Sequence, residues 1–160
     1  MGAKPIEITG EPSGDMPPPP AGYMPLFRSS AFLDLVGPLF YRPEEQTFKV
    51  GMRVLPQHAN SSGTMHGGLI ATLADVSLGY VTSHSRSPAL IMSTASLTVD
   101  YLSAVPMGSW VESHVSISKI GRNLAFADAL ICADERQVAK ARALFNVVDA
   151  PPGTGTSRKT

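Results

Sequence analysis

The sequence is poor in several residue types, and each shortage excludes a class of function. Its single cysteine, Cys132, excludes an internal disulfide and a cysteine metal cluster, and its place in an alternating run predicts a buried thiol. Lys and Arg (13) balance Asp and Glu (13), so the chain has no basic surface for nucleic acid or anionic lipid. The histidines do not show metal-ligand spacing: His58, His66, His84 and His114. We therefore expect no bound metal and no nucleic-acid partner.

Long hydrophobic runs are also missing. The N-terminal residues are polar and proline-rich and contain no apolar stretch like that of a secretory signal. The most apolar segment, which follows His66, is too short to span a bilayer and is interrupted by Thr72, Asp75 and Ser77. These features predict a cytoplasmic protein without a membrane partner.

Proline and glycine divide the chain into three parts. Half of the 14 prolines lie within residues 1–25, and this segment, with its "PPPP", predicts a mostly disordered arm that is locally polyproline II. The "PPGTGTSRKT" of residues 151–160 predicts a flexible tail. The remaining residues, 26–150, are enough for one globular domain with its own core.

The first half of this domain predicts two helices and two strands. "LFRSSAFLDLVG" predicts a short helix that turns four apolar side chains inward: Phe27, Phe32, Leu33 and Leu35. "PLFYRPEEQTFKVGMRVLP" predicts two strands around a turn at residues 43–45. A long helix follows from about residue 66 to about residue 85, where "SRSP" ends it.

The second half predicts only strands. Four alternating segments, residues 89–104, 108–121, 123–135 and 137–150, form a meander with short turns between them. One long helix beside such a meander predicts an α+β fold in which a curved antiparallel sheet wraps around the helix. The helix is apolar on nearly all sides, so we expect a second structure to cover the side that the sheet leaves open.

Asp75 lies within this apolar helix, which indicates a functional role. A carboxylate in such surroundings costs several kcal/mol unless it is paired or used. Asp75 lies eight residues after Gly67, the first glycine of "HGG". A backbone N–H at the start of a helix lacks an intrahelical partner and lies at the positive end of the helix dipole, so the Gly67 amide can polarise a carbonyl and hold an oxyanion. The adjacent glycines, Gly67 and Gly68, would let a ligand carbonyl approach the backbone.

Helix geometry separates these two groups. Eight residues correspond to about 12 Å along the axis at about 1.5 Å per residue. A general base must lie within about 3 Å of its proton or reach it through one water, so Asp75 cannot serve a carbonyl held by Gly67 of its own helix. Two antiparallel helices across a twofold axis would bring them together. The spacing therefore predicts a homodimer with a shared site and an Asp75 buried at its seam.

Three motifs carry a resemblance to a known family. "NSSGTMHGGLIATLAD", "SLTVDYL" and "KIGRNLAF" resemble the hotdog-fold acyl-CoA thioesterases of the phenylacetate-degradation-protein type, over roughly residues 28–148. The resemblance implies hydrolysis of an acyl- or aryl-CoA thioester to free acid and coenzyme A. It implies no metal or redox cofactor, since coenzyme A is part of the substrate. It also implies a homodimer as the minimal active unit, assembled into a dimer of dimers.

The resemblance also implies roles for individual residues. Asn60, Gly67 and Asp75 form the reaction site, with Asp75 of the partner subunit acting as general base or nucleophile. Thr94 holds the attacking water, and Ser93 takes this place if the preceding loop is one residue longer. For His66 two interpretations stay open: it orients the thioester carbonyl, or it braces the loop.

The turn "KIGRN" supplies candidate contacts for coenzyme A. Arg122 can bind a phosphate through two N–H groups, and Lys119 can act as a point charge. Gly68 is a third candidate contact through its amide. The alternative for the two cations is an ordinary solvated turn.

Two other functions compete with hydrolysis. A hotdog hydratase or dehydratase needs a catalytic His with a carboxylate partner, whereas here the acid follows a His-Gly-Gly helix start. A non-catalytic acyl-CoA sensor would carry a DNA-binding helix pair or lack the acid, and this chain does neither. The sequence leaves the acyl group open.

Overall fold

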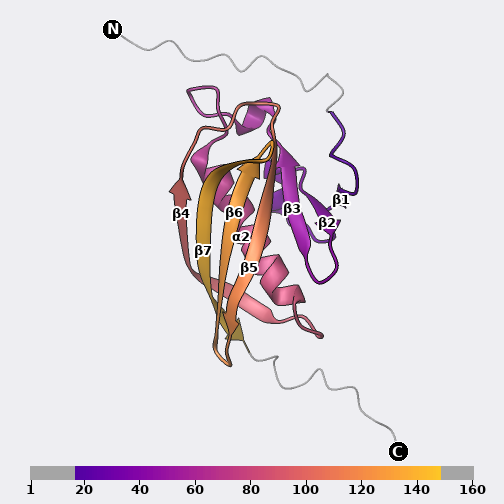
Figure 1. Cartoon of the computed structure of the whole chain (residues 1–160), viewed down its shortest axis with the longest axis vertical. Helices are drawn as coiled ribbons and strands as arrows, with labels where there is room; N and C mark the ends of the chain where they lie inside the picture. Colours follow the sequence, from indigo (N-terminus) through magenta and orange to yellow (C-terminus); the bar gives the residue numbers. More distant parts are fainter. Residues whose placement is uncertain (1–16, 149–160) are drawn as a thin grey trace, which may run out of the picture.

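The computed structural model describes residues 17–148, which form one antiparallel sheet with a long helix across one face (Figure 1). The seven strands are ordered β1-β2-β3-β5-β6-β7-β4. Their bounds are β1 Met24–Pro25, β2 Phe40–Pro43, β3 Phe48–Arg53, β4 Ile91–Tyr101, β5 Trp110–Ile120, β6 Leu124–Ala133 and β7 Arg136–Val148. The helices are α1 Ala31–Val36 and α2 Gly67–His84, with a 3-10 turn at Pro56–His58. The predicted α+β architecture is confirmed.

Helix α2 begins and ends within one residue of the predicted bounds. Its inward side buries eight residues: Leu69, Ile70, Leu73, Ala74, Ser77, Leu78, Val81 and Thr82. Because these residues recur in pairs every four positions, the residues between them, such as Thr72, Asp75 and Tyr80, lie on a second side that stays half-exposed. Within one chain the sheet therefore covers only one side of the helix, and Asp75 is half-exposed.

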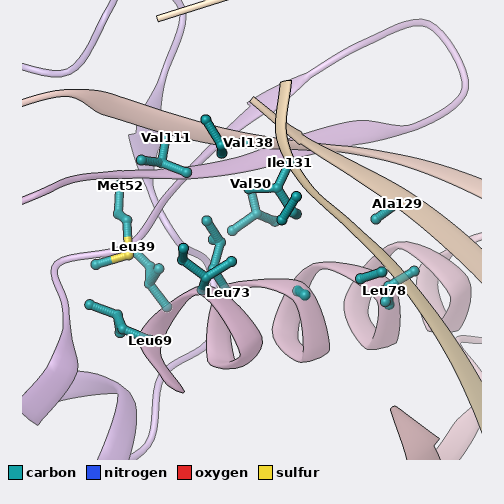
Figure 2. Packing of buried hydrophobic residues seen from close by; sticks show 14 of the residues in the cluster. Leu39, Val50, Met52, Leu69, Leu73, Leu78, Val111, Ala129, Ile131 and Val138 are labelled. Atoms are coloured by element: carbon teal, nitrogen blue, oxygen red, sulfur yellow. The ribbon is translucent and has the colours of Figure 1, made fainter. Parts of the chain in front are cut away.

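The core lies between α2 and the sheet (Figure 2). Leu73 and Leu78 of α2 are fully buried and pack toward strand residues such as Val50 and Ile131. Beneath the helix, the inward-facing positions of β6 and β7 are mostly alanine: Ala125, Ala127, Ala129, Ala133, Ala139, Ala141 and Ala143. Small side chains on a sheet allow a helix to pack close to it.

Strand β4 runs back along α2 in the opposite direction. It starts beside the end of the helix, where the Leu90 N–H donates to the Ser83 carbonyl, and it ends at Tyr101 beside Gly67. It pairs with β7 and forms one edge of the sheet in the described part of the chain. A β-bulge interrupts this pairing, since Thr94 faces Phe145 and Ser96 faces Leu144, which leaves Ala95 as the extra residue.

The prediction for the first helix was wrong in part. Only Leu33 is buried in α1, whereas Phe32 and Leu35 are 57% and 79% exposed. At about 3.6 residues per turn, positions 32, 33 and 35 spread widely around the helix axis, so the side that buries Leu33 leaves Phe32 and Leu35 exposed. Phe27 lies before α1 and packs edge-on against the rings of Tyr41 and His84.

The structure describes only the last part of the predicted N-terminal arm, residues 17–25. Residues 1–16 and 149–160, including the predicted C-terminal tail, lie outside the described residues. Residues 20–25 differ from the prediction, because Tyr23 is buried and its ring lies 4.7 Å from that of Trp110, in an edge-on arrangement. The Tyr23 hydroxyl donates to Oε2 of Glu112 at 2.7 Å. These contacts hold Tyr23, within the predicted arm, against the sheet.

Cys132 also differs from its prediction. It lies half-buried on the outer face of the sheet, opposite Glu112, because outward positions of β6 alternate with the buried alanines. Burial, and then the Glu112 charge, raise the pKa of the Cys132 thiol. Burial alone would raise the pKa of Glu112 too, but hydrogen bonds from Tyr23 and Lys49 outweigh it and bring that pKa below its ordinary value. Among the helices of residues 17–148, none has the length and apolarity needed to cross a membrane.

Candidate active site

The start of α2 is capped by the side chain that precedes it. His66 is the N-cap residue, with an extended backbone, and its Nδ1 accepts the Gly68 N–H at 2.9 Å. A ring nitrogen that accepts a hydrogen bond presents a lone pair, so the proton of neutral His66 sits on Nε2. The Nε2–H is then a donor available to a ligand. His66 therefore braces the helix start and offers a donor at the same time.

Glycine is favoured at positions 67 and 68 for a structural reason that differs from the predicted one. A Cβ on Gly67 would lie 3.3 Å from the ring of Tyr101, and a Cβ on Gly68 would lie 3.1 Å from Nδ1 of His66. Both positions are thus occupied by rings of the same chain, not left open for a ligand. The Gly68 amide is also engaged by His66, which argues against Gly68 as a contact for coenzyme A.

The Gly67 amide is better placed for a ligand. It is the first residue of α2, so its N–H has no carbonyl one turn earlier in the helix. Among residues 17–148, no hydrogen bond from this N–H to another group occurs. The dipole of an 18-residue helix adds partial positive charge at this point. A carbonyl oxygen or an oxyanion can be bound here.

Asn60 shapes the loop that leads to the helix. Its side-chain oxygen accepts the N–H groups of Ser62 (2.9 Å) and Thr64 (3.2 Å), and its Nδ2 donates to Oγ1 of Thr64 (3.0 Å). This is an Asx-type turn, in which the side chain binds the backbone that follows it. The oxygen is taken up within the loop, and Nδ2 keeps one further hydrogen that a ligand could accept.

The structure brings Asp75 and Thr94 together. The Thr94 hydroxyl donates to Oδ1 of Asp75 at 2.8 Å, from β4 to the middle of α2. Ser93 pairs with the exposed Asn146 on the outer face of the sheet, whereas Thr94 faces the buried Phe145. Of the two predicted candidates, only Thr94 reaches the carboxylate.

Asp75 and Thr94 line a cavity of about 820 Å³ between the half-exposed side of α2, β4 and α1. Most of its wall is apolar or aromatic, including Phe32, Val76, Tyr80, Met92 and Leu97. Cavities with an apolar wall and few polar groups are typical of small-molecule sites. The carboxylate is one of the few charged groups in this wall, so a substrate in the cavity would meet it.

Two parts of the predicted site lie apart in one chain. Gly67 and Asp75 belong to the same continuous helix, so about 12 Å of helix axis separates them. The described residues of a single chain thus hold a carbonyl-binding amide at one place and the carboxylate at another. This geometry is the one from which a shared site was predicted.

The two cations lie at the far end of the domain from Gly67. The Asn123 carbonyl of the β5–β6 turn accepts the N–H of Val147, which pairs with Met92 near the start of β4. Because β4 starts beside the end of α2, this turn lies at the end of the domain that holds the end of α2 (Figure 1). Lys119 and Arg122 are exposed there. No three His, Cys, Asp or Glu side chains within residues 17–148 gather closely enough to hold a metal ion.

One contact at the helix start was missed by the sequence reasoning. The sequence predicted no role for Tyr101 of "SLTVDYL", yet its hydroxyl donates to the Gly67 carbonyl at 2.9 Å. The signal that could have found it is the glycine itself, because a helix that starts with glycine often does so to admit a neighbouring group.

Comparison with known proteins identifies the family of this chain. A family model described as "Thioesterase superfamily" matches residues 62–140. Over 129 residues the chain is 44% identical to the Pseudomonas aeruginosa protein named "Putative esterase PA0474", a match that covers 80% of this chain and 96% of that protein. The chain belongs to the thioesterase superfamily.

Further similarities support the class and the fold of this thioesterase. It is 33% identical over 78 residues to acyl-coenzyme A thioesterase 13 of Mus musculus, covering 48% of this chain and 54% of the mouse protein. The solved structure of the Escherichia coli PaaI protein from the phenylacetic acid degradation operon matches with a TM-score of 0.68 at 21% identity, covering 76% of this chain and 86% of that one. The predicted hotdog fold and the predicted class, a thioester hydrolase, are confirmed.

Proposed function

We propose that this thioester hydrolase acts on acyl-CoA or aryl-CoA and releases a free acid and coenzyme A. The observation that carries the proposal is the Asp75 carboxylate, which Thr94 holds in the wall of an otherwise largely apolar cavity of about 820 Å³. An apolar wall suits an acyl chain or an aryl ring. The similarity to a mouse protein named acyl-coenzyme A thioesterase supports coenzyme A as the carrier.

Asp75 is the group that drives the attack on the thioester. Thr94 gives its hydroxyl hydrogen to Oδ1 of Asp75, so the Thr94 oxygen can still accept a hydrogen from water. A water held in this way lies next to the carboxylate, which removes its proton as the water oxygen attacks the thioester carbon. The tetrahedral intermediate then expels the coenzyme A thiolate. Asp75 returns the proton to the thiolate and is ready for another turnover.

A second route uses the same carboxylate as a nucleophile. Asp75 would attack the carbonyl directly, release the thiolate and form an acyl anhydride that water then hydrolyses. Water that attacks the thioester directly places its oxygen in the released acid alone. Water that attacks the Asp75 carbon of the anhydride places it in the Asp75 carboxylate, so an Asp75 labelled after a single turnover in ¹⁸O-water would identify the nucleophilic route.

The start of α2 supplies the oxyanion donors. The Gly67 N–H and the Nε2–H of His66 are two donors at the positive end of the helix, and both suit a thioester oxygen that becomes negatively charged. The remaining Nδ2 hydrogen of Asn60, in the loop before the helix, could add a third contact. In this proposal His66 and Gly67 stabilise the charge, while Asp75 and Thr94 handle the water.

These donors and the carboxylate meet only if two chains combine. The helix separates Gly67 from Asp75 by about 12 Å, so we propose that Asp75 of each subunit completes the site at Gly67 of the other. The exposed edge of β4 and the half-exposed side of α2 are the surfaces that such a homodimer would cover. Lys119 and Arg122, which lie far from their own Gly67, would then lie nearer the Gly67 of the partner subunit, where they could bind the phosphates of coenzyme A.

A thiol-release assay over a panel of short-chain, medium-chain and aryl-CoA substrates tests the function. We expect release of free coenzyme A with at least one class, and loss of that release in Asp75→Asn. Binding of acyl-CoA without thiol release by the wild type would contradict hydrolysis and favour a sensor. Hydration of an enoyl-CoA in place of thiol release would favour a hydratase.

A further inference from the structure

Tyr101 contacts the first peptide group of α2 but has no part in the reaction proposed above. It is the last residue of β4, where it pairs with Ala139 of β7. The next two residues, Leu102 and Ser103, both donate their N–H groups to the Val138 carbonyl, so the backbone at this end of β4 is well anchored. From this support the Tyr101 ring lies against Gly67 and its hydroxyl donates to the Gly67 carbonyl at 2.9 Å.

The peptide group between Gly67 and Gly68 is held at both ends. Its carbonyl accepts the Tyr101 hydroxyl, and its N–H donates to Nδ1 of His66. A hydrogen bond to the oxygen of a peptide group polarises the group and makes its N–H a stronger donor. Stronger donation to Nδ1 in turn draws electron density from the imidazole and makes the Nε2–H a better donor. One chain of hydrogen bonds therefore links Tyr101 to the outward side of His66.

We propose that Tyr101 is a positioning residue for thioester hydrolysis, acting through the Gly67–Gly68 peptide group on the His66 ring. The inference rests on the proposed function, because it assigns to Tyr101 the task of orienting and polarising the donor that His66 gives to the thioester oxygen. Tyr101 itself does not touch the reacting atoms. Its hydroxyl strengthens the Gly68 N–H bond that fixes the tautomer and the direction of the His66 ring, and its own ring packs against Gly67.

The exposure of Tyr101 fits a positioning role better than a role in the core. The residue is 53% exposed, so its ring adds little to the buried apolar core of the domain. A hydroxyl near solvent can bind water instead of a carbonyl, and its net contribution to stability is then small. The aligned bond to Gly67 thus has a larger effect on local geometry than on folding.

The test compares Tyr101→Phe with Tyr41→Phe as a matched control. Both variants lose one phenolic hydroxyl, but Tyr41 lies in β2 within an aromatic cluster and away from the helix start. We expect Tyr101→Phe to lower kcat about 3- to 10-fold with little change in KM or Tm, which is the size of one lost hydrogen bond. Tyr41→Phe leaves kcat unchanged. Equal kcat values for the wild type and Tyr101→Phe would overturn the inference.

A double-mutant cycle shows whether Tyr101 acts through His66. In a His66→Ala background the donor at the end of the chain is absent, so Tyr101→Phe should cause little further loss of kcat. Losses that multiply in full would mean that Tyr101 acts independently of His66, and the inference would be wrong. This result separates positioning from a general loss of structure.

NMR of the imidazole and amide nitrogens gives a readout that needs no turnover. In the wild type we expect His66 to be protonated at Nε2, and in Tyr101→Phe we expect the Gly68 amide proton to move upfield as its hydrogen bond weakens. Protonation of the neutral ring at Nδ1 in the wild type would overturn the inference even if Tyr101→Phe did not fold. Absence of thiol release by the wild type would count against the proposed function, whereas wild-type turnover that Tyr101→Phe leaves unchanged counts against Tyr101 alone.

Discussion

The Thr94 hydroxyl and the Asp75 carboxylate are joined by a hydrogen bond of 2.8 Å that links the edge strand β4 to the middle of helix α2. The bond fixes Oδ1 of the carboxylate, while Oδ2 has no hydrogen-bond partner among residues 17–148. It also consumes the Thr94 hydrogen, so the Thr94 oxygen is available as an acceptor. In this pair Thr94 is the donor and Asp75 the acceptor, and variants of either residue can test its role.

Asp75→Asn tests the carboxylate. The amide keeps the size of the side chain but can neither take a proton from water nor attack a thioester, so we expect kcat to fall at least about 10²-fold. Folding and acyl-CoA binding are expected to persist, because Asp75 is half-exposed and is not part of the core. Thiol-release kinetics, with Tm and a binding isotherm for the variant, check this expectation. A kcat near the wild-type value would place the chemistry elsewhere.

Thr94→Val tests the partner, with Ser93→Ala as its matched control. Valine has the shape of threonine but lacks the hydroxyl, and we expect kcat to fall about 3- to 10-fold through loss of one hydrogen bond. Thr94→Ser should restore most of the activity, since it returns the hydroxyl. Ser93 faces the opposite side of the sheet, so Ser93→Ala should leave kcat unchanged. The reverse pattern would show that the water-holding residue is Ser93.

Mixed dimers test the sharing of the site. Gly67→Val places a side chain where the Tyr101 ring lies, which should displace the oxyanion donor, and Asp75→Asn removes the base. Each variant alone should be inactive. In a mixed dimer one site carries both lesions and the other carries neither, so random pairing should return up to about one quarter of wild-type activity. Mixed dimers that form without regaining activity would place both groups in one chain.

Arg122→Ala tests recognition of coenzyme A. If Arg122 binds a nucleotide phosphate, we expect KM for the acyl-CoA to rise at least about 10-fold with kcat nearly unchanged, in line with the loss of a charge-assisted hydrogen bond. The matching acyl-pantetheine, which lacks the nucleotide, should show no change in KM. Equal increases for both substrates would mean that Arg122 supports the fold or the cavity instead.

Glu112→Gln tests the anchor of the N-terminal segment through its pH dependence. The pKa of Glu112 in the folded chain lies below its ordinary value of 4.5, since hydrogen bonds from Tyr23 and Lys49 outweigh the effect of burial. Its contribution to stability is therefore fully present above about pH 4.5 and is lost as the pH falls through the lower, folded-state pKa. We expect the Tm difference between wild type and Glu112→Gln to be largest near neutral pH and to shrink in acid. The exposed Glu45→Gln should show no such difference.

The fold could be predicted because its elements have strong local patterns. The long helix is a run of apolar and small residues with a breaker at its end, and the later strands alternate between short turns. Tyr23 could not be placed in this way, because its partner Glu112 lies 89 positions away and no local pattern joins them. Cys132 was assigned to the wrong side, because a strand of small and apolar residues alternates too weakly to show which set faces the helix.

The choice between Ser93 and Thr94 as the partner of Asp75 could not be settled from the sequence for a different reason. Side chains alternate along a regular strand, so counting in steps of two from Tyr101 arrives at Ser93 and not at Thr94. The extra residue at Ala95 shifts this count by one and turns both Thr94 and Tyr101 toward α2. Bulges leave little trace in a single sequence. The separation of Gly67 from Asp75 within one chain, in contrast, follows from helix rise alone.

The buried alanines of β6 and β7 set the distance between helix α2 and the sheet, because each places only a methyl group between them. Asp75 belongs to helix α2 and Thr94 to strand β4 of the sheet. The distance between their side chains therefore depends on the distance between the helix and the sheet. Replacing Ala127 or Ala141 by a larger residue would lift the helix and stretch the contact, although neither side chain lines the cavity. Residues without any functional group can thus set both the distance between Asp75 and Thr94 and the height of the cavity that these two residues line.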